Sequence, residues 1–135
     1  MFLNKRKVIF LISIFILVFI LTIDDIKSQE LKVVDGDTIH LNGEKIRFKG
    51  IDTPELKQIC IKDGSKNRCG ETAKQILINK IGENKVECIR EGIDQYQRTL
   101  AECFVNDESL SSYLVKSGYA FAYRKYSKKF IKDED

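Results

Sequence analysis

The feature that most constrains this chain is an Asn42-Gly43 pair between two segments of alternating polarity. An Asn-Gly pair favours a two-residue turn, because both residues tolerate a positive φ. Alternation of period two is typical of a half-buried strand. On both sides of the pair every second residue is apolar, namely Ile39, Leu41, Ile46 and Phe48. The segment therefore predicts an antiparallel hairpin with one face against a hydrophobic core.

Further elements surround this hairpin. Residues 31–34, 86–88 and 100–105 read as three more short strands, and residues 52–69 and 91–98 as loops. Residues 71–81 place apolar side chains on one helical face and precede Gly82, a typical C-terminal cap. A second, short helix is predicted between Ser109 as its cap and Gly118. This order predicts a mainly β, α+β domain, a five-stranded Greek-key barrel of the OB type flanked by two or three helices.

The N-terminal segment differs from the rest in composition. Residues 8–23 are apolar except for Ser13 and Thr22, and they follow Lys5-Arg6-Lys7. A cationic start before a short apolar run indicates a signal peptide, and an uncleaved membrane anchor is the alternative. We therefore expect residues 1–28 to be a leader or anchor and residues 29–135 to be the domain. Either way the domain is exported: secreted, periplasmic or tethered to the outer face of the cytoplasmic membrane.

The net charge does not by itself indicate a nucleic-acid partner. The whole chain carries a formal charge of +3, and removal of residues 1–28 lowers it to +1, because four basic and two acidic side chains are lost. A domain with so small an excess has no global basic field. The case for a substrate must therefore come from individual residues.

Four cysteines lie in the exported part, which favours two disulfides over free thiols. Three pairings are possible in principle, and we favour Cys60–Cys69, which closes a short loop, with Cys88–Cys103, which ties neighbouring strands. A zinc site made of all four thiolates is the alternative. It is less favoured, because the chain lacks the close C-x2-C pairs that tetrahedral zinc modules use.

The Cys88–Cys103 pairing also predicts the register of a hairpin. A symmetric ladder through that pair opposes Arg90 to Ala101 and Gly92 to Thr99, and it leaves Gln95-Tyr96 at the tip. The disulfide would then hold the base of the loop that contains Arg98.

Two aspartates are predicted to come together at one end of the first hairpin. Folding at Asn42-Gly43 brings Asp37 close to the residues after Phe48, so that it can meet the turn Asp52-Thr53-Pro54-Glu55. Carboxylates with a backbone carbonyl form a hard-oxygen site that suits calcium. Taken singly, each aspartate is better explained as a turn former than as a metal ligand.

Three further side chains could act on a phosphate. Arg47 lies on the third strand and Arg98 ends the second loop, and guanidinium groups bind phosphate oxygens bidentately. Glu55 could hold or activate a water. A solvated surface arginine is the alternative for either arginine alone. His40 is the only histidine, which excludes nuclease chemistries that need two.

An ordered set of motifs carries a family resemblance. Arg47 stands five residues before Asp52-Thr53-Pro54-Glu55, and it lies between Val34-Asp35-Gly36-Asp37-Thr38 and Asp94-x-Tyr96-x-Arg98. With the aromatic segment 118–127, these motifs resemble the thermonuclease (staphylococcal nuclease-like) family, in its exported four-cysteine bacterial type. The resemblance covers about residues 31–130.

The resemblance implies roles for these residues. The positions that match Asp37 and Asp52 bind Ca²⁺ through carboxylates, and the position of Thr53 binds through its main-chain carbonyl. The positions that match Arg47, Glu55 and Arg98 are catalytic. The positions that match Tyr96 and Tyr126 border the substrate. The implied activity is calcium-dependent hydrolysis of DNA and RNA at the P–O5′ bond, which leaves 3′-phosphates. We expect a monomer that contacts a membrane only through an uncleaved N-terminal segment.

Two departures from the family pattern leave alternatives open. Gln97 stands where the family usually has glycine, and the family's long C-terminal helix has room only to begin at residues 127–132. We therefore expect a domain that is short at its C-terminus. A non-catalytic nucleic-acid-binding OB barrel and a truncated, inactive nuclease are the alternatives to an active enzyme.

Overall fold

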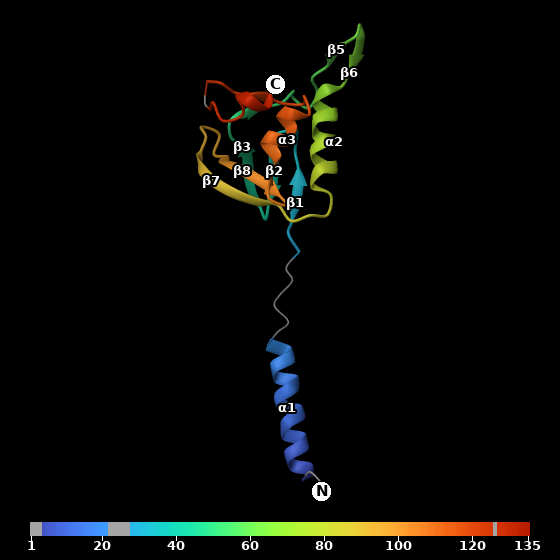
Figure 1. The fold of residues 1–135 in the computed structure, drawn as a ribbon, viewed down its shortest axis with the longest axis vertical. Helices are drawn as coiled ribbons and strands as arrows, with labels where there is room; N and C mark the ends of the chain where they lie inside the picture. Colours follow the sequence, from blue (N-terminus) through green and yellow to red (C-terminus); the bar gives the residue numbers. More distant parts are fainter. Residues whose placement is uncertain (1–3, 22–27, 126) are drawn as a thin grey trace.

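A computed structural model describes residues 4–21, 28–125 and 127–135. The N-terminal helix α1 spans Lys5–Leu21. None of the helices among the described residues is both long enough and apolar enough to cross a bilayer. The rest of the described chain forms a barrel with helices at its side (Figure 1).

The main sheet has the strand order expected for an OB-type barrel. Its order is β1-β2-β3-β8-β7, with a parallel pairing between β3 and β8 and antiparallel pairings elsewhere. Short β9 pairs with β8. The strands are β1 (Leu31–Val33), β2 (Thr38–Leu41), β3 (Glu44–Phe48), β7 (Glu87–Ile93), β8 (Thr99–Val105) and β9 (Glu108–Ser109). The predicted α+β fold with a five-stranded OB-type core is confirmed.

The central hairpin forms as the sequence predicts. Asn42 and Gly43 both have positive φ, 51° and 83°, as a two-residue turn of this kind requires. The register places Ile39 opposite Ile46 and Thr38 opposite Arg47. Ile39 and Ile46 are fully buried, so the alternating pattern does direct one face of the hairpin into the core.

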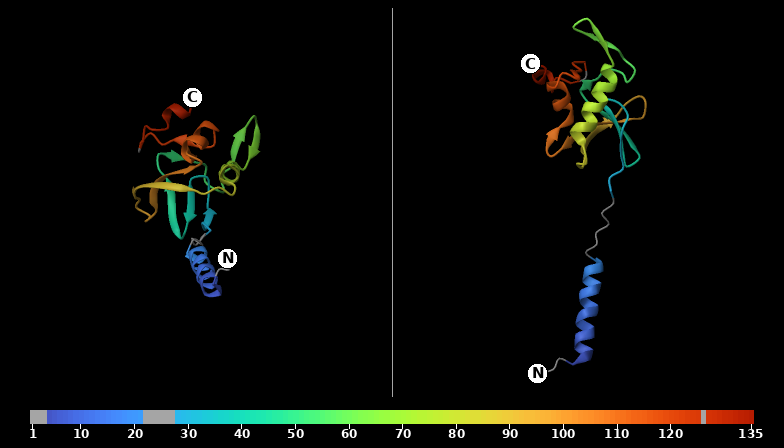
Figure 2. Two further views of the ribbon diagram at one scale, coloured as in Figure 1. Left: turned by 60° about the horizontal axis from the view of Figure 1, so that its bottom comes forward. Right: turned by 90° about the vertical axis from the view of Figure 1, so that its right-hand side faces the viewer.

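Two helices cover one side of the barrel (Figure 2). Helix α2 (Cys69–Ile81) buries Ala73, Leu77 and Ile81, and it begins two residues before the predicted start. Helix α3 (Leu110–Lys116) lies beside α2, and the Ser109 hydroxyl caps it by accepting a 3.3 Å hydrogen bond from the N–H of Ser112. Both predicted helices are therefore confirmed.

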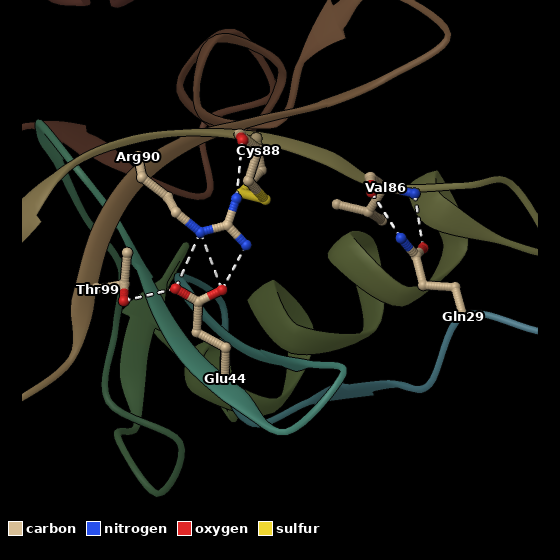
Figure 3. The surroundings of a disulfide bond; sticks show 7 residues. Gln29, Glu44, Val86, Cys88, Arg90 and Thr99 are labelled. Atoms are coloured by element: carbon tan, nitrogen blue, oxygen red, sulfur yellow. Dashed lines mark hydrogen bonds and ion pairs between the residues drawn. A yellow bond between two sulfur atoms is a disulfide. The ribbon is translucent and has the colours of Figure 1, made fainter.

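A side chain joins the two segments that lead into the first and last strands of the sheet order. No ladder links β1 to β7 in the part of the chain that the structure describes. Instead, the side-chain amide of Gln29 donates to the Val86 carbonyl at 2.7 Å and accepts from the Val86 N–H at 2.8 Å (Figure 3). This pair satisfies both main-chain groups of Val86, which is itself buried.

Both predicted disulfides are present, and they leave no free cysteine that could serve a zinc site. Cys88 lies directly opposite Cys103, and Arg90 opposite Ala101, as expected. The expected pairing of Gly92 with Thr99 is wrong, because a bulge between Arg90 and Gly92 shifts the register by one residue. Gly92 therefore faces Leu100, and Ile93 faces Thr99.

The bulge changes the loop at the end of this hairpin. Strand β7 continues to Ile93, so the loop comprises residues 94–98 rather than 91–98. Tyr96 stands at its centre, where the sequence predicted Gln95-Tyr96 at the tip. The bulge residue Glu91 pairs with Lys49 at 2.6 Å.

The predicted loop 52–69 contains a second hairpin. Strands β5 (Cys60–Lys62) and β6 (Ser65–Asn67) pair antiparallel, and β4 (Ile51–Asp52) pairs with β10 (Phe121–Ala122). The turn between β5 and β6 is Asp63-Gly64, with φ values of 51° and 75°. Asp-Gly is a strong hairpin signal, so the sequence contained the information that the loop prediction did not use.

The C-terminal segment packs on the barrel. Phe130 is 3% exposed and belongs to the hydrophobic core. A short 3-10 helix, η1 (Ile131–Asp133), follows it. The Glu134 carboxylate accepts a 2.7 Å hydrogen bond from the N–H of Ala122 in β10.

Candidate active site

Asp37 lies at the centre of the candidate site, in the short link between β1 and β2. Its Oδ2 accepts hydrogen bonds from the N–H and the hydroxyl of Thr53, each of 3.0 Å. Its Oδ1 accepts from the Thr38 hydroxyl at 3.1 Å. A Cβ at Gly36 would stand 2.8 Å from the Thr53 hydroxyl, so glycine is what permits this close approach. The turn that contains Asp52 and Thr53 is thereby held against Asp37.

Arg47 joins the two aspartates. Its guanidinium forms ion pairs with Asp37 and, at 2.9 Å, with Asp52. Burial alone would lower the pKa of Arg47, but the two carboxylates outweigh this effect and raise the pKa above its ordinary value. The hairpin therefore brings Asp37, Arg47 and Asp52 together, as the sequence predicts.

Arg98 is fixed by its own loop. Its Nε donates to Oδ2 of Asp94 at 2.7 Å, and its main-chain N–H donates to Oδ1 at 3.0 Å. Burial alone would raise the pKa of Asp94. The hydrogen bonds from Arg98 and from the N–H of Tyr96 together have the larger effect, so the pKa lies below its ordinary value. The guanidinium also lies 5.4 Å from the centroid of the Tyr96 ring. No hydrogen bond or ion pair among the described residues engages its two terminal nitrogens.

The main chain of Glu55 is fixed, while its side chain is exposed. Its N–H donates to the Gln58 side chain at 3.1 Å, and its carbonyl accepts from the Gln58 N–H at 2.7 Å. A Cβ at Gly70 would stand 1.8 Å from the Glu55 carbonyl oxygen. The start of α2 therefore packs directly on the backbone of Glu55.

These residues line two adjoining hollows. A polar one of about 110 Å³ is lined by Asp35, Asp37, Arg47, Thr53, Pro54, Glu55 and Arg98. A larger groove of about 540 Å³ contains Asp52, Tyr96, Lys49 and Tyr123. Arg47 and Arg98 line both. All predicted metal-binding and catalytic residues thus lie at one place, whereas Tyr126 lies outside the described residues.

The donor set fits a hard cation. Among the described residues no three His, Cys, Asp or Glu side chains are grouped as a metal site, but the predicted set needs only two carboxylates and a carbonyl. Asp35, which the sequence analysis did not select, accepts a 3.1 Å bond from the N–H of Asp37. Burial and then the charge of Asp37 raise the pKa of Asp35. Crowded carboxylates at a polar hollow suit calcium, which prefers oxygen ligands.

A network behind the loop of Arg98 was not predictable from sequence motifs. The Glu44 carboxylate accepts from Arg90 Nε at 3.0 Å and from the Thr99 hydroxyl at 2.7 Å (Figure 3). Hydrogen bonds from Arg90 and then Thr99 lower the pKa of Glu44. The network joins β3, β7 and β8 beside the Cys88–Cys103 disulfide. It fixes both strands that lead into the loop with Arg98.

Comparison with known families agrees with this geometry. A family model described as staphylococcal nuclease homologue matches residues 45–135, more than half of the chain. The chain belongs to the staphylococcal nuclease family.

Curated relatives support the same assignment. An uncharacterized endonuclease of Haemophilus influenzae is 32% identical over 102 residues, which are 72% of this chain and 52% of that protein. The thermonuclease of Staphylococcus intermedius is 33% identical over 97 residues, 67% of this chain and 56% of that protein. The succinoglycan biosynthesis protein ExoI of Rhizobium meliloti is 32% identical over 94 residues, which are 67% of this chain and 49% of that protein. The chain spans about half the length of these relatives.

Proposed function

We propose that this chain hydrolyses phosphodiester bonds in DNA and RNA in a calcium-dependent reaction. The observation that carries the proposal is that Arg47, on β3, and Arg98, in the loop between β7 and β8, line one polar hollow with Asp37 and Glu55. Two guanidinium groups at one hollow can bind the oxygens of a single phosphate. The family and the relatives named endonuclease and thermonuclease support the same activity.

Each residue has a defined part in the proposed reaction. Arg47 and Arg98 bind the non-bridging oxygens and neutralise the charge that develops on them. Glu55 orients a water and accepts its proton as the water oxygen attacks phosphorus. The P–O5′ bond breaks, its electron pair leaves with O5′, which takes up a proton from water, and the 3′-phosphate remains on the other product. The terminal nitrogens of Arg98, without partners among the described residues, are available for this contact.

Asp37, Asp52 and the Thr53 carbonyl would hold the calcium ion. When bound, the ion would supply positive charge that stabilises the phosphoryl oxygens. Arg47 already pairs with both aspartates, so the same carboxylates would position the arginine and the ion. Tyr96 borders the groove beside the hollow, and we propose that it and Tyr126 contact the substrate by stacking.

We also propose that the domain acts outside the cytoplasm. Two disulfides in one small domain support an oxidising compartment. The basic start and apolar run of the N-terminal segment support export as a secreted, periplasmic or tethered protein.

The test is cleavage of end-labelled DNA and RNA by the oxidised chain in mild detergent, with calcium or with excess chelator. The proposal predicts cleavage of both substrates with calcium, products that end in 3′-phosphates, and no cleavage with chelator. Asp37→Asn should lose calcium-supported cleavage, whereas Asp107→Asn, a change at an exposed turn, should not. Cleavage that persists in chelator or leaves 5′-phosphates would contradict the mechanism.

A further inference from the structure

The β5–β6 hairpin stands apart from the core. It projects beyond the end of α2 in both views (Figures 1 and 2). Cys60 pairs with Asn67, Ile61 with Lys66 and Lys62 with Ser65. Every residue from 61 to 68 is exposed. The hairpin therefore contributes nothing to the core of this domain, and it presents side chains to solvent on both faces.

Positive charge is concentrated on this segment. Residues 57–68, called here the basic ribbon, contain Lys57, Lys62, Lys66 and Arg68 against the single acid Asp63. The ribbon thus carries a formal charge of +3, whereas residues 29–135 as a whole carry +1. Among the ion pairs of the described residues, none engages any of the three lysines. These cations are available to an external anion.

Exposed aliphatic side chains accompany the charge. Ile61 is 73% exposed and lies directly opposite Lys66, so the two side chains share one face of the ribbon. Ile59, two residues before Ile61, is 59% exposed. A face that combines lysine with isoleucine suits a nucleic-acid strand, in which phosphates alternate with less polar sugars and bases.

The ribbon is anchored beside the polar hollow. The Cys60–Cys69 disulfide closes its base, and Gly70 follows directly and packs on the Glu55 carbonyl. Gln58 makes hydrogen bonds to both main-chain groups of Glu55. The ribbon and the turn with Glu55 are therefore one continuous, cross-linked unit. The exposed ribbon therefore continues directly from the turn that lines the polar hollow.

We propose that the basic ribbon is a second nucleic-acid-binding element that holds the substrate strand beyond the phosphate in the hollow. The inference rests on the proposed nuclease function, which it deepens. The lysines contact phosphates, and Ile59 and Ile61 pack against sugars or bases. The ribbon therefore favours long substrates over short ones and leaves the chemical step unchanged.

The test compares two triple variants of the full, oxidised chain in mild detergent. The ribbon variant carries Lys57→Gln, Lys62→Gln and Lys66→Gln. The control variant carries Lys32→Gln, Lys45→Gln and Lys85→Gln, which remove the same charge from exposed positions elsewhere. Binding to a fluorescent 30-nucleotide DNA is measured with chelator over a range of salt, and kcat/KM is measured with calcium for that DNA and for a trinucleotide.

The ribbon variant should bind the 30-nucleotide DNA about tenfold more weakly at low salt. The slope of its log binding constant against log salt concentration should become smaller by roughly 2, because each of the three lost phosphate contacts on a single strand contributes about 0.7. Its kcat/KM should fall for the 30-nucleotide DNA and stay unchanged for the trinucleotide. Equal binding by the ribbon and control variants, or an equal loss on the trinucleotide, would overturn the inference. If the unaltered chain cleaves neither substrate, that result contradicts the proposed function instead. The binding comparison then still decides the role of the ribbon.

Discussion

Asp37 accepts two hydrogen bonds of 3.0 Å from Thr53, one from its N–H and one from its hydroxyl. These bonds connect the entry of the central hairpin to the turn after it, so that Asp52 and Glu55 are set relative to Asp37. Arg47 completes the arrangement through its pairs with Asp37 and Asp52. The candidate site therefore depends on close main-chain packing as well as on charged side chains.

Gly70→Ala tests that packing. The added methyl would stand 1.8 Å from the Glu55 carbonyl oxygen, so the start of α2 or the turn must move. We expect a loss of stability of about 1–3 kcal/mol, typical of overpacking, and a lower kcat. Urea denaturation and the cleavage rate measure both. Gly43→Ala, where φ is 83° and no atom lies within 4 Å of the added methyl, is the comparison for backbone strain without overpacking, and it should leave the cleavage rate unchanged. An unchanged cleavage rate in Gly70→Ala would contradict the account.

Gln97→Gly tests the strain in the loop of Arg98. Gln97 has a φ of 62°, in the left-handed region that favours glycine. Replacement by glycine should relieve about 1 kcal/mol and retain the cleavage rate, because the loop conformation stays the same. Urea denaturation measures the gain. A loss of stability would show that the Gln97 side chain makes a contact that outweighs the strain.

The backbone plan was predictable where local signals act alone. Asn42-Gly43 and the alternation around it determine the hairpin, and that hairpin brings Asp37, Arg47 and Asp52 together. The ordered motifs also placed Glu55 and Arg98 at the same site. The pairing of Cys88 with Cys103 followed from their positions on neighbouring strands.

Features that depend on distant neighbours were not predictable in this way. The bulge before Gly92 shifts the register by one residue, and the only local signal for it is the glycine itself. The Gln29 pair with Val86 and the Glu44 network join residues far apart in sequence. The β5–β6 hairpin was missed for a different reason, because its Asp63-Gly64 signal lies in a polar segment without a buried face.

The two disulfides should differ in their effects. Cys88 and Cys103 tie the strands that lead into the loop of Arg98, so Cys88→Ala with Cys103→Ala should lower both stability and activity. The chain-entropy model gives about 3 kcal/mol for a loop of this length. Cys60→Ala with Cys69→Ala should act mainly on the order of the ribbon, seen as faster amide exchange at residues 57–68. Thermal denaturation and the trinucleotide rate compare the pairs, and a larger rate loss on removing Cys60 and Cys69 would reverse this assignment.

Glu44 should make stability depend on pH. Bonds from Arg90 and Thr99 hold the pKa of Glu44 below its ordinary value, which is about 4.3 in an unfolded chain. Because the folded pKa is the lower one, this contribution is complete above about pH 4.3 and is lost as the pH falls through the folded pKa. The stability difference between the unaltered chain and Glu44→Gln should therefore be larger at pH 7 than at pH 3. Urea denaturation at both values measures it, and a constant difference would contradict the role of the network.

The most direct test of the account is the turnover of Arg47→Lys and Arg98→Lys on a trinucleotide with saturating calcium. Lysine keeps the charge but cannot reproduce the planar, bidentate contact with phosphate oxygens. Each change should lower kcat by about 100-fold or more, the usual effect of removing one preorganised donor. Arg124→Lys, an exposed arginine that pairs with Glu134, should keep the normal rate. Near-normal turnover by Arg47→Lys or Arg98→Lys, with the fold intact, would contradict the claim that these two arginines carry the reaction.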